Sequence, residues 1–298
     1  MTALRVDVLG IGAWAAGFEG WPAMRAALRG DASSSAASSP PSSPPSSTSC
    51  SASIDTRRPS HPSPALLPAT ERRRAPESVA VALEVAREAV GMASATHAIE
   101  ASSLASVFAS AYGDLAIVDY LCATLATDPM LLSPTRFHHS VHNAAAAYWS
   151  IATHDTGPAS AIAAGDATFA AGLLEAATQA CAENRAVLLV AFDTPAVGSL
   201  PMDEPNTALF GMAMVLAPTK HPVKSALAAP TIALTIEIRD GATSLPFPKI
   251  ASLHALSASS PSARALALIE ALASERDARI EYPLSAASTL AIDARRAG

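Results

Sequence analysis

The sequence is poor in charge, in aromatic residues and in cysteine. Only 15% of its 298 residues are charged and 5% are aromatic, whereas an average globular protein is about 25% charged. The 20 Lys and Arg residues are outnumbered by 26 Asp and Glu residues and form no extended stripe, which argues against nucleic-acid binding. Cys50, Cys122 and Cys181 are scattered without metal-type spacing, so we expect a reduced, cytoplasmic protein.

Long apolar runs and targeting signals are lacking as well. The stretch from Pro205 to Thr219 contains two prolines and is shorter than the roughly 20 residues of a spanning helix, so no transmembrane segment is expected. The first residues show no basic segment followed by an apolar one, so no signal peptide is predicted. The apolar share is nevertheless 50%, which excludes a wholly disordered chain because a large core can form.

One compositional break divides the chain. Residues 32–68 are dominated by Ser, Ala and Pro and cannot bury enough apolar surface to offset their conformational entropy, which predicts a disordered loop. A strand precedes this tract and the main body follows it, so we interpret it as an insertion within one domain. The flanking parts are residues 1–31, with the first strand and helix, a main body at 69–218, and a carboxy-terminal portion at 219–298.

Hydrophobic periodicity predicts alternating strands and helices, which is typical of an α/β layered fold. Strands are expected at Leu4–Ile11, Leu104–Ala109, Ala159–Ala164, Ala186–Phe192, Ala208–Leu216 and Ile232–Ile238. Helices are expected at Trp21–Arg29, Pro76–Val90, Leu115–Leu125, Val141–Ala152, Ala167–Ala182 and Arg264–Ser274. The tail after Ser285 carries no clear pattern.

A glycine motif follows the first strand. Gly10-Ile-Gly12-Ala13-Trp14-Ala15 has the G-x-G-x-x-A spacing of dinucleotide-binding turns. The Ser/Pro tract stands where the second strand of such a unit would lie, so a tight turn that closes a buried strand is favoured. No cofactor is predicted.

Three histidines lie close together in the chain. His139 and His142 are three residues apart and could share a helix face with His138 nearby. The closest acids, Asp128 and Asp155, are distant in sequence, so partly buried histidines with hydrogen-bond partners are favoured. No metal site is predicted.

The segment from Gly157 to Thr168 turns a strand sharply into a long apolar helix. Asp166 stands at the turn, where a helix amino terminus stabilises negative charge. Aspartate is a poor acyl nucleophile but a good helix cap, an effect of about 1 kcal/mol, so we expect Asp166 to cap the helix.

The stretch from Phe137 to Thr153 (FHHSVHNAAAAYWSIAT), followed by this turn, resembles the amino-terminal half of β-ketoacyl synthases. It is most similar to the short ketosynthase-like chain-length factors of aryl polyene pigment clusters. The Gly10-Ile-Gly12 strand, the helix after Arg74 and the segment Thr207–Ala213 fit the same pattern. The resemblance implies a thiolase-like, ketosynthase-type layered fold whose second half is truncated or degenerate.

The sequence departs from that family where the chemistry is carried out. Counting from Gly157 places Asp166 at the position of the nucleophilic cysteine, and only His221 and His254 follow it, neither in the family's catalytic context. Condensation needs a thiolate to form the acyl thioester and histidines to assist decarboxylation. The resemblance therefore implies a subunit that does not condense acyl groups by itself.

Such a subunit would pair with an active β-ketoacyl synthase and shape its acyl tunnel, with an acyl carrier protein as a further partner. The resemblance gives the dimer strand as Ala159, Ser160, Ala161, Ile162, Ala163 and Ala164. It gives tunnel candidates at Phe137, His142, Asn143, Trp149 and Phe169, for which ordinary core packing is the alternative.

Carrier-protein docking is assigned to Arg72, Arg73 and Arg74, with Arg57 and Arg58 nearby. A solvated basic run before a helix is the favoured alternative for this cluster. Two other functions stay open for the whole chain: decarboxylation of malonyl-carrier protein to supply primer, and a purely structural role that solubilises a partner.

Overall fold

The structure is a computed structural model that describes residues 3–30, 61–97, 99–198, 206–219 and 232–296. Most of the Ser/Pro tract, with Cys50, Arg57 and Arg58, and also His221, lie outside the described residues. Within the described ranges, no helix combines the length and the apolar character needed to cross a membrane.

The strands form one mixed sheet in the order β4-β3-β5-β6-β1-β7-β9-β8, with the short β2 paired to β1. β3 runs parallel to β4 and β5, and the other pairings are antiparallel. The strands are β1 Leu4–Ala15, β2 Phe18–Glu19, β3 Ala105–Ala109, β4 Ala159–Ile162, β5 Val187–Asp193, β6 Phe210–Pro218, β7 Ile232–Asp240, β8 Ala278–Ser285 and β9 Ser288–Arg296.

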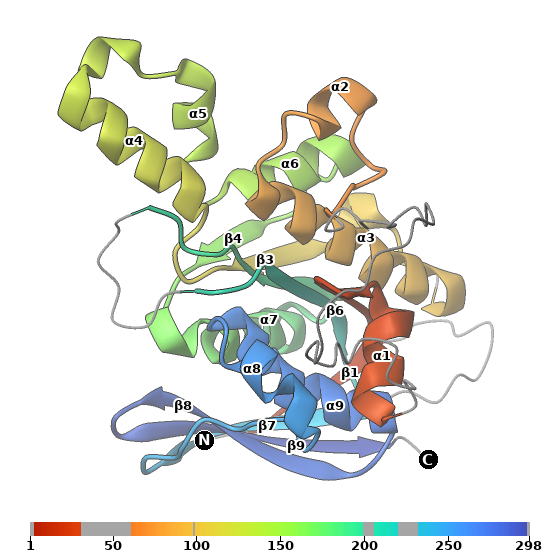
Figure 1. Cartoon of the computed structure of the whole chain (residues 1–298). Coiled ribbons are helices and arrows are strands. Elements are labelled where there is room, and N and C mark those ends of the chain that lie inside the picture. The colour runs from red at the N-terminus through yellow and green to blue at the C-terminus, as the bar shows by residue number, and fades with distance from the viewer. Residues whose placement is uncertain (1–2, 31–60, 98, 199–205, 220–231, 297–298) are drawn as a thin grey trace, which may run out of the picture.

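Helices cover both faces of this sheet, giving three layers (Figure 1). α3 and α6 pack on one face, while α1, α7 and α9 pack on the other. The helices are α1 Trp21–Arg29, α2 Ala69–Arg72, α3 Glu77–His97, α4 Leu115–Thr127, α5 Pro134–His139, α6 Ala144–Thr153, α7 Thr168–Glu183, α8 His254–Ser257 and α9 Leu266–Ser274. Short 3-10 turns are η1 Ala101–Ser103, η2 Pro129–Leu131, η3 Gly165–Ala167, η4 Ala251–Leu253 and η5 Ser262–Ala265.

β5 shows why the sheet needs both helix layers. Its alternate residues Val187 and Leu189 enter one apolar cluster, and Leu188 and Val190 enter the other. A strand buried on both faces has a continuous apolar sequence rather than an alternating one. The predicted α/β layering and the buried strand predicted at Ala186–Phe192 are confirmed, with the strand at Val187–Asp193 in the structure.

The glycine motif does not form the expected turn. β1 runs unbroken from Leu4 to Ala15, so Gly10 and Gly12 lie inside a strand. A Cβ on Gly12 would stand 2.1 Å from the carbonyl oxygen of Val85 in α3, and one on Gly10 equally close to that of Ala89. The two glycines therefore allow helix α3 to pack directly on the strand backbone, and the turn interpretation was wrong.

Several predicted boundaries also differ from the structure. The helix predicted from Val141 begins at Ala144, and the helix predicted from Arg264 begins at Leu266 after η5. Residues 61–68, which we placed in the disordered tract, pack against the body, with Leu67 only 3% exposed. The tail without a pattern supplies β9, which pairs with both β7 and β8. Residues 232–296 thus extend the same sheet.

Candidate functional site

Three chain segments meet where the parallel strands end. β3, β4 and β5 run in the same direction, so the turns after Ala109, Ile162 and Asp193 lie at one edge of the sheet. Ligand sites in α/β sheets commonly form at the carboxyl ends of such strands. The turn after β4, residues 163–168, holds Asp166, and we call it the elbow.

The elbow does not use Asp166 as a helix cap. The chain passes through η3, with Gly165 at a φ of 52°, before α7 begins at Thr168. The Thr168 hydroxyl accepts a hydrogen bond from the Ala164 N–H and donates one to the Gly165 carbonyl. No side chain caps α7 at its first residue, so the expected capping role of Asp166 was wrong.

Asp166 instead pairs with Arg264 of η5, 98 positions further along the chain. One guanidinium nitrogen lies 3.1 Å from the Asp166 carboxylate, and another donates to the Asp166 carbonyl at 2.8 Å. The Arg264 side chain is only 10% exposed, whereas that of Asp166 is 70% exposed. The Asp166 side chain, which the resemblance aligns with the nucleophilic cysteine of the family, is therefore engaged with a largely buried cation.

A buried carboxylate, Asp193, ties the neighbouring turns together at the end of β5. Its oxygens accept hydrogen bonds from Ser110 Oγ, the Ala111 N–H and the Ser262 N–H. Burial raises the pKa of the Asp193 carboxyl, while these hydrogen bonds oppose that shift. Thr194, the next residue, accepts a hydrogen bond from the Leu115 N–H at the start of α4. One hydrogen-bond network therefore fixes η5 and the turn that leads to α4.

The space beside Asp166 is small. A cavity of about 20 Å³ is lined by Asp166, Asn206, Ala258, Ser259, Ser260, Pro261 and Arg264. This volume holds about one water molecule. The lining offers no thiol and no imidazole for acyl transfer. Cys122 and Cys181 are elsewhere, on α4 and α7, and His254 bonds the Pro248 carbonyl.

The histidines near α6 have separate partners. His139 Nε2 lies 2.8 Å from the Tyr148 hydroxyl, and His142 Nε2 lies 2.9 Å from the Ser110 carbonyl oxygen. Burial lowers the pKa of His139, and the neighbouring His138 lowers it further. His139 ends α5 and His142 precedes α6, so the two do not share a helix face. Within the described ranges, no three His, Cys, Asp or Glu residues are grouped to hold a metal ion.

The tunnel candidates lie in different environments. Trp149 is 1% exposed in the cluster under α3, and its indole N–H has no acceptor among the described residues. Phe169 is also 1% exposed, in the opposite cluster, edge-on to Tyr282 with ring centroids 5.3 Å apart. Phe137 is 61% exposed on α5. Asn143 precedes α6 and makes no capping bond with its side chain. The structure therefore does not bring these residues together around the elbow cavity.

The residues assigned to the dimer strand form an open sheet edge. Ala159–Ile162 is β4, whose one strand partner among the described residues is β3, while Ala163 and Ala164 lie in the elbow. Edge strands are usually protected by charged residues or proline against pairing with another chain, and this strand contains neither. A projecting arm, residues 115–139, stands off the body on the same side of the molecule (Figure 1).

Large apolar side chains are exposed on this arm and on α6. Met130 is 89% exposed and Ile151 is 72% exposed. The others are Leu125, Leu131 and Phe137 on the arm and Val141 in the turn between the arm and α6. Exposed apolar patches of this kind mark interaction surfaces. The arm, α6 and β4 together form what we call the apolar face.

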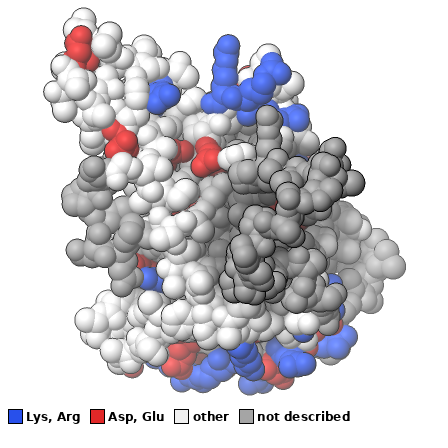
Figure 2. Space-filling view, viewed as in Figure 1, with Lys and Arg blue, Asp and Glu red and all other residues white. Residues whose placement is uncertain are grey.

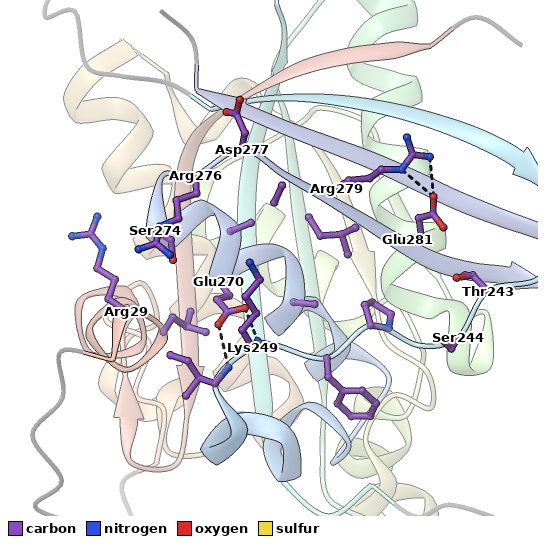
Figure 3. A pocket seen from close by; sticks show the side chains of 18 residues that line it. Arg29, Thr243, Ser244, Lys249, Glu270, Ser274, Arg276, Asp277, Arg279 and Glu281 are labelled. Atoms are coloured by element: carbon purple, nitrogen blue, oxygen red, sulfur yellow. Dashed lines mark hydrogen bonds and ion pairs between the residues drawn. The ribbon is translucent and has the colours of Figure 1, made fainter.

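The opposite end of the sheet has a different character. β8 is also an edge strand, but it contains Pro283 and the paired charges of Arg279 and Glu281, 2.8 Å apart (Figure 3). A pocket of about 1150 Å³ lies beside it, between α9 and the segment before η4. Glu270 in this pocket accepts hydrogen bonds from the backbone N–H groups of Lys249 and Ile250. None of the tunnel candidates lines the pocket.

The basic cluster lies at the end of α2, where blue side chains gather at the top of Figure 2. Arg72 is partly tied down, because its guanidinium donates to the Leu67 carbonyl at 2.9 Å. Arg73 and Arg74 are exposed. Two of the three arginines therefore present their charge to solvent.

The comparisons with known proteins decide the family. The family profile described as "Beta-ketoacyl synthase, N-terminal domain" matches residues 48–266, which is most of the chain. The chain belongs to the β-ketoacyl synthase family. The resemblance found in the sequence is thereby confirmed. No curated protein sequence in the comparison matches this chain.

Solved structures with similar folds include ketosynthase complexes. One is the ketosynthase ApeO in complex with its chain length factor ApeC from Xenorhabdus doucetiae, with 20% identity and a TM-score of 0.64 over 97% of this chain and 99% of that one. Another is the ishigamide ketosynthase/chain length factor, with 14% identity and a TM-score of 0.66 over 99% and 100% of the two chains.

A third similar structure is AntDE:AntF, a type II PKS acyl-carrier protein in complex with its ketosynthase. It shows 10% identity and a TM-score of 0.65 over 99% of this chain and 100% of that one. These similarities confirm the thiolase-like, ketosynthase-type layered fold.

Sequence reasoning missed Arg264, Asp193 and Asn206. Asp193 could have been noticed, because an acid directly after a buried strand sits at the functional edge of a parallel sheet. Arg264 gave no local signal, because its contact with Asp166 spans 98 positions.

Proposed function

We propose that this chain is a non-catalytic chain-length factor that pairs with an active β-ketoacyl synthase in aryl polyene or related polyketide or fatty-acid-type synthesis. The observation that carries the proposal is an unprotected, uncharged edge strand, β4, beside an exposed apolar arm. The family membership and the ketosynthase-type fold support it. The pairing takes place in the cytoplasm, and an acyl carrier protein delivers the substrate to the complex.

The two edges of the sheet support β4 as the pairing strand. An extended partner segment adds to an edge only where backbone groups are free and no charge or proline opposes it. β8 carries Pro283 and the Arg279–Glu281 pair, whereas Ala159, Ser160 and Ala161 of β4 are small and uncharged. Pairing through β4 also covers the apolar face, which is costly to leave in water.

The elbow supports a subunit that does not form an acyl-enzyme. Asp166 lacks a thiol, and Arg264 holds both its carboxylate and its carbonyl group. The neighbouring cavity of about 20 Å³ has no room for an acyl chain. Chemistry in such a complex is therefore left to the partner's cysteine and histidines.

The chain acts on product length through the apolar face. Phe137 on the arm and His142 and Asn143, which directly precede α6, lie near the covered surface and line the partner's acyl tunnel. Trp149 lies behind them with an indole N–H that has no acceptor among the described residues, and Phe169 supports the elbow from the sheet's other face. A bulkier wall shortens the product, because it limits how far an acyl chain can extend.

A charge placed on β4 tests the proposal. Ala161→Lys puts an ammonium on an exposed position of the pairing strand without disturbing the core. We expect it to weaken binding of the ketosynthase by about tenfold or more, since a desolvated lysine opposes strand pairing. The matched control is Ser285→Lys, at an exposed position of the opposite edge strand. Equal binding by both variants and the wild type would overturn the proposed interface.

Loss of Arg73 and Arg74 tests carrier-protein docking separately. Reversal of both charges to Glu reduces carrier-protein binding and leaves ketosynthase binding intact, because α2 is not part of the apolar face. Carrier-protein binding that survives the reversal shows that the cluster is only a solvated run.

A further inference from the structure

We propose that Asp166 and Arg264 form a clasp through which the carboxy-terminal part of the chain positions the elbow and the pairing strand β4. Asp166 is then a positioning residue and not only the remnant of a lost nucleophile. The effect of the clasp on partner binding rests on the proposed function, whereas its effect on the elbow does not.

The clasp has two arms that differ in what they require. One guanidinium nitrogen of Arg264 bonds the Asp166 carboxylate, and another bonds the Asp166 carbonyl oxygen. Only the first arm depends on the aspartate side chain, whereas both depend on Arg264. Hydrogen bonds to charged groups are stronger than neutral ones, and the arginine geometry fixes the direction of both bonds.

The backbone around Arg264 is fixed by hydrogen bonds to two buried side chains. Ser262, two residues before Arg264, donates its N–H to buried Asp193 at 2.8 Å, and the Tyr282 hydroxyl donates to the Arg264 carbonyl at 3.2 Å. Tyr282 also packs edge-on against Phe169 in the first turn of α7. β5, β8 and η5 thus form a fixed base from which the guanidinium reaches the elbow.

The elbow is short and is joined to a weakly held strand. Only Ala163, Ala164 and Gly165 separate β4 from Asp166. In the part of the chain that the structure describes, β4 has a strand neighbour, β3, on one side and none on the other. A strand with a single neighbour exchanges hydrogen bonds with water more readily than a central strand. A contact that fixes the elbow therefore also limits the motion of β4.

The burial of the Arg264 side chain explains why Arg264 holds Asp166. The guanidinium of Arg264 is almost removed from water, and Asp166 is the carboxylate that pairs with it in the described structure. A buried charge that loses its partner is strongly disfavoured. Arg264 therefore draws the elbow inward, although Asp166 itself lies at the surface.

Hydrogen exchange of the isolated chain, followed by mass spectrometry, tests the clasp without any partner. The variants are Asp166→Ala, Arg264→Gln and the double variant. We expect exchange in residues 158–168 to rise about threefold in Asp166→Ala and about tenfold in Arg264→Gln, with the double variant equal to Arg264→Gln alone. Exchange in β5, residues 187–193, stays unchanged.

The matched control is Glu281→Ala, which removes an ion pair with Arg279 at the opposite edge strand, where both side chains are exposed. It should leave exchange in residues 158–168 at the wild-type rate. If Arg264→Gln fails to fold, Tyr282→Phe serves in its place, because it removes only the hydroxyl that donates to the Arg264 carbonyl. Unchanged exchange at the elbow in Asp166→Ala, or an equal rise throughout β5, would overturn the clasp.

Ketosynthase binding gives the second readout. Asp166→Ala and Arg264→Gln should weaken binding by factors similar to their effects on exchange, and Arg264→Lys should restore part of it because it keeps the charge. If the wild-type chain does not bind a ketosynthase, the proposed function fails and the exchange result still decides on the clasp. If the wild type binds and the variants bind equally well, the link from the clasp to pairing is wrong.

Discussion

Gly12 of β1 lies so close to Val85 of α3 that a Cβ on the glycine would stand 2.1 Å from the Val85 carbonyl oxygen. This contact brings the longest helix of the described structure directly onto the centre of the sheet. The glycines of the G-x-G motif thus serve helix–strand packing, which is a structural role and not a phosphate-binding one.

Gly12→Ala should lower the free energy of unfolding by about 2–3 kcal/mol, because the backbone of α3 must shift to admit the methyl group. Urea denaturation measures the change. The matched control is Gly91→Ala in α3, where a Cβ meets nothing within 4 Å. There alanine should stabilise the helix by up to about 1 kcal/mol. Similar effects at both positions would contradict the close-packing account.

Trp149 and Phe137 should respond differently to truncation. Trp149→Ala removes a side chain that is 1% exposed and should cost about 3–5 kcal/mol of unfolding free energy. Phe137→Ala, at a position 61% exposed, should change stability by less than about 0.5 kcal/mol. Phe137→Ala should nevertheless alter product length in the reconstituted complex. Product lengths identical to the wild type would remove Phe137 from the tunnel.

The contribution of His139 to stability should fall as the pH drops below the ordinary histidine pKa of 6.5, whereas the raised pKa of the buried Asp193 carboxyl acts in the opposite direction as the pH falls. Burial lowers the pKa of His139 in the folded state, so the unfolded chain binds more protons between the lowered pKa and 6.5. The contribution of His139 to the free energy of unfolding is therefore constant above that range and decreases as the pH falls through it. His97 shifts in the same direction.

Urea midpoints at about pH 7.5 and about pH 5.5, in the wild type and in His139→Gln, check this dependence. The glutamine keeps a polar group next to Tyr148 and does not titrate. The variant should lose less stability on acidification than the wild type. Equal losses in the two proteins would show that His139 does not contribute.

Much of the layered fold was predictable, because β5 is apolar from Val187 to Phe192 and the helix from Glu77 has a clear periodicity. The G-x-G segment misled because a glycine pair in a strand and one in a turn look alike locally. β9 gave no usable pattern, although its residues Leu290 and Ile292 are buried. Its pairing with β7 joins segments far apart in the chain.

The candidate site was predictable only in part. Counting along the elbow found Asp166 and β4, because these features are local. The capping role failed because Thr168 satisfies the elbow backbone and Arg264 attracts the carboxylate. Long-range contacts of this kind leave no spacing signal in a single sequence.

The most direct test of the account is the mass of the assembly formed when this chain is co-expressed with the ketosynthase encoded nearest to it. Size exclusion with light scattering should show a one-to-one complex, with the isolated chain self-associating as its concentration rises, because the apolar face is then exposed. A stable monomer or homodimer that does not bind the ketosynthase would contradict the account. Release of CO2 from malonyl-carrier protein by that isolated species would point to the decarboxylase instead.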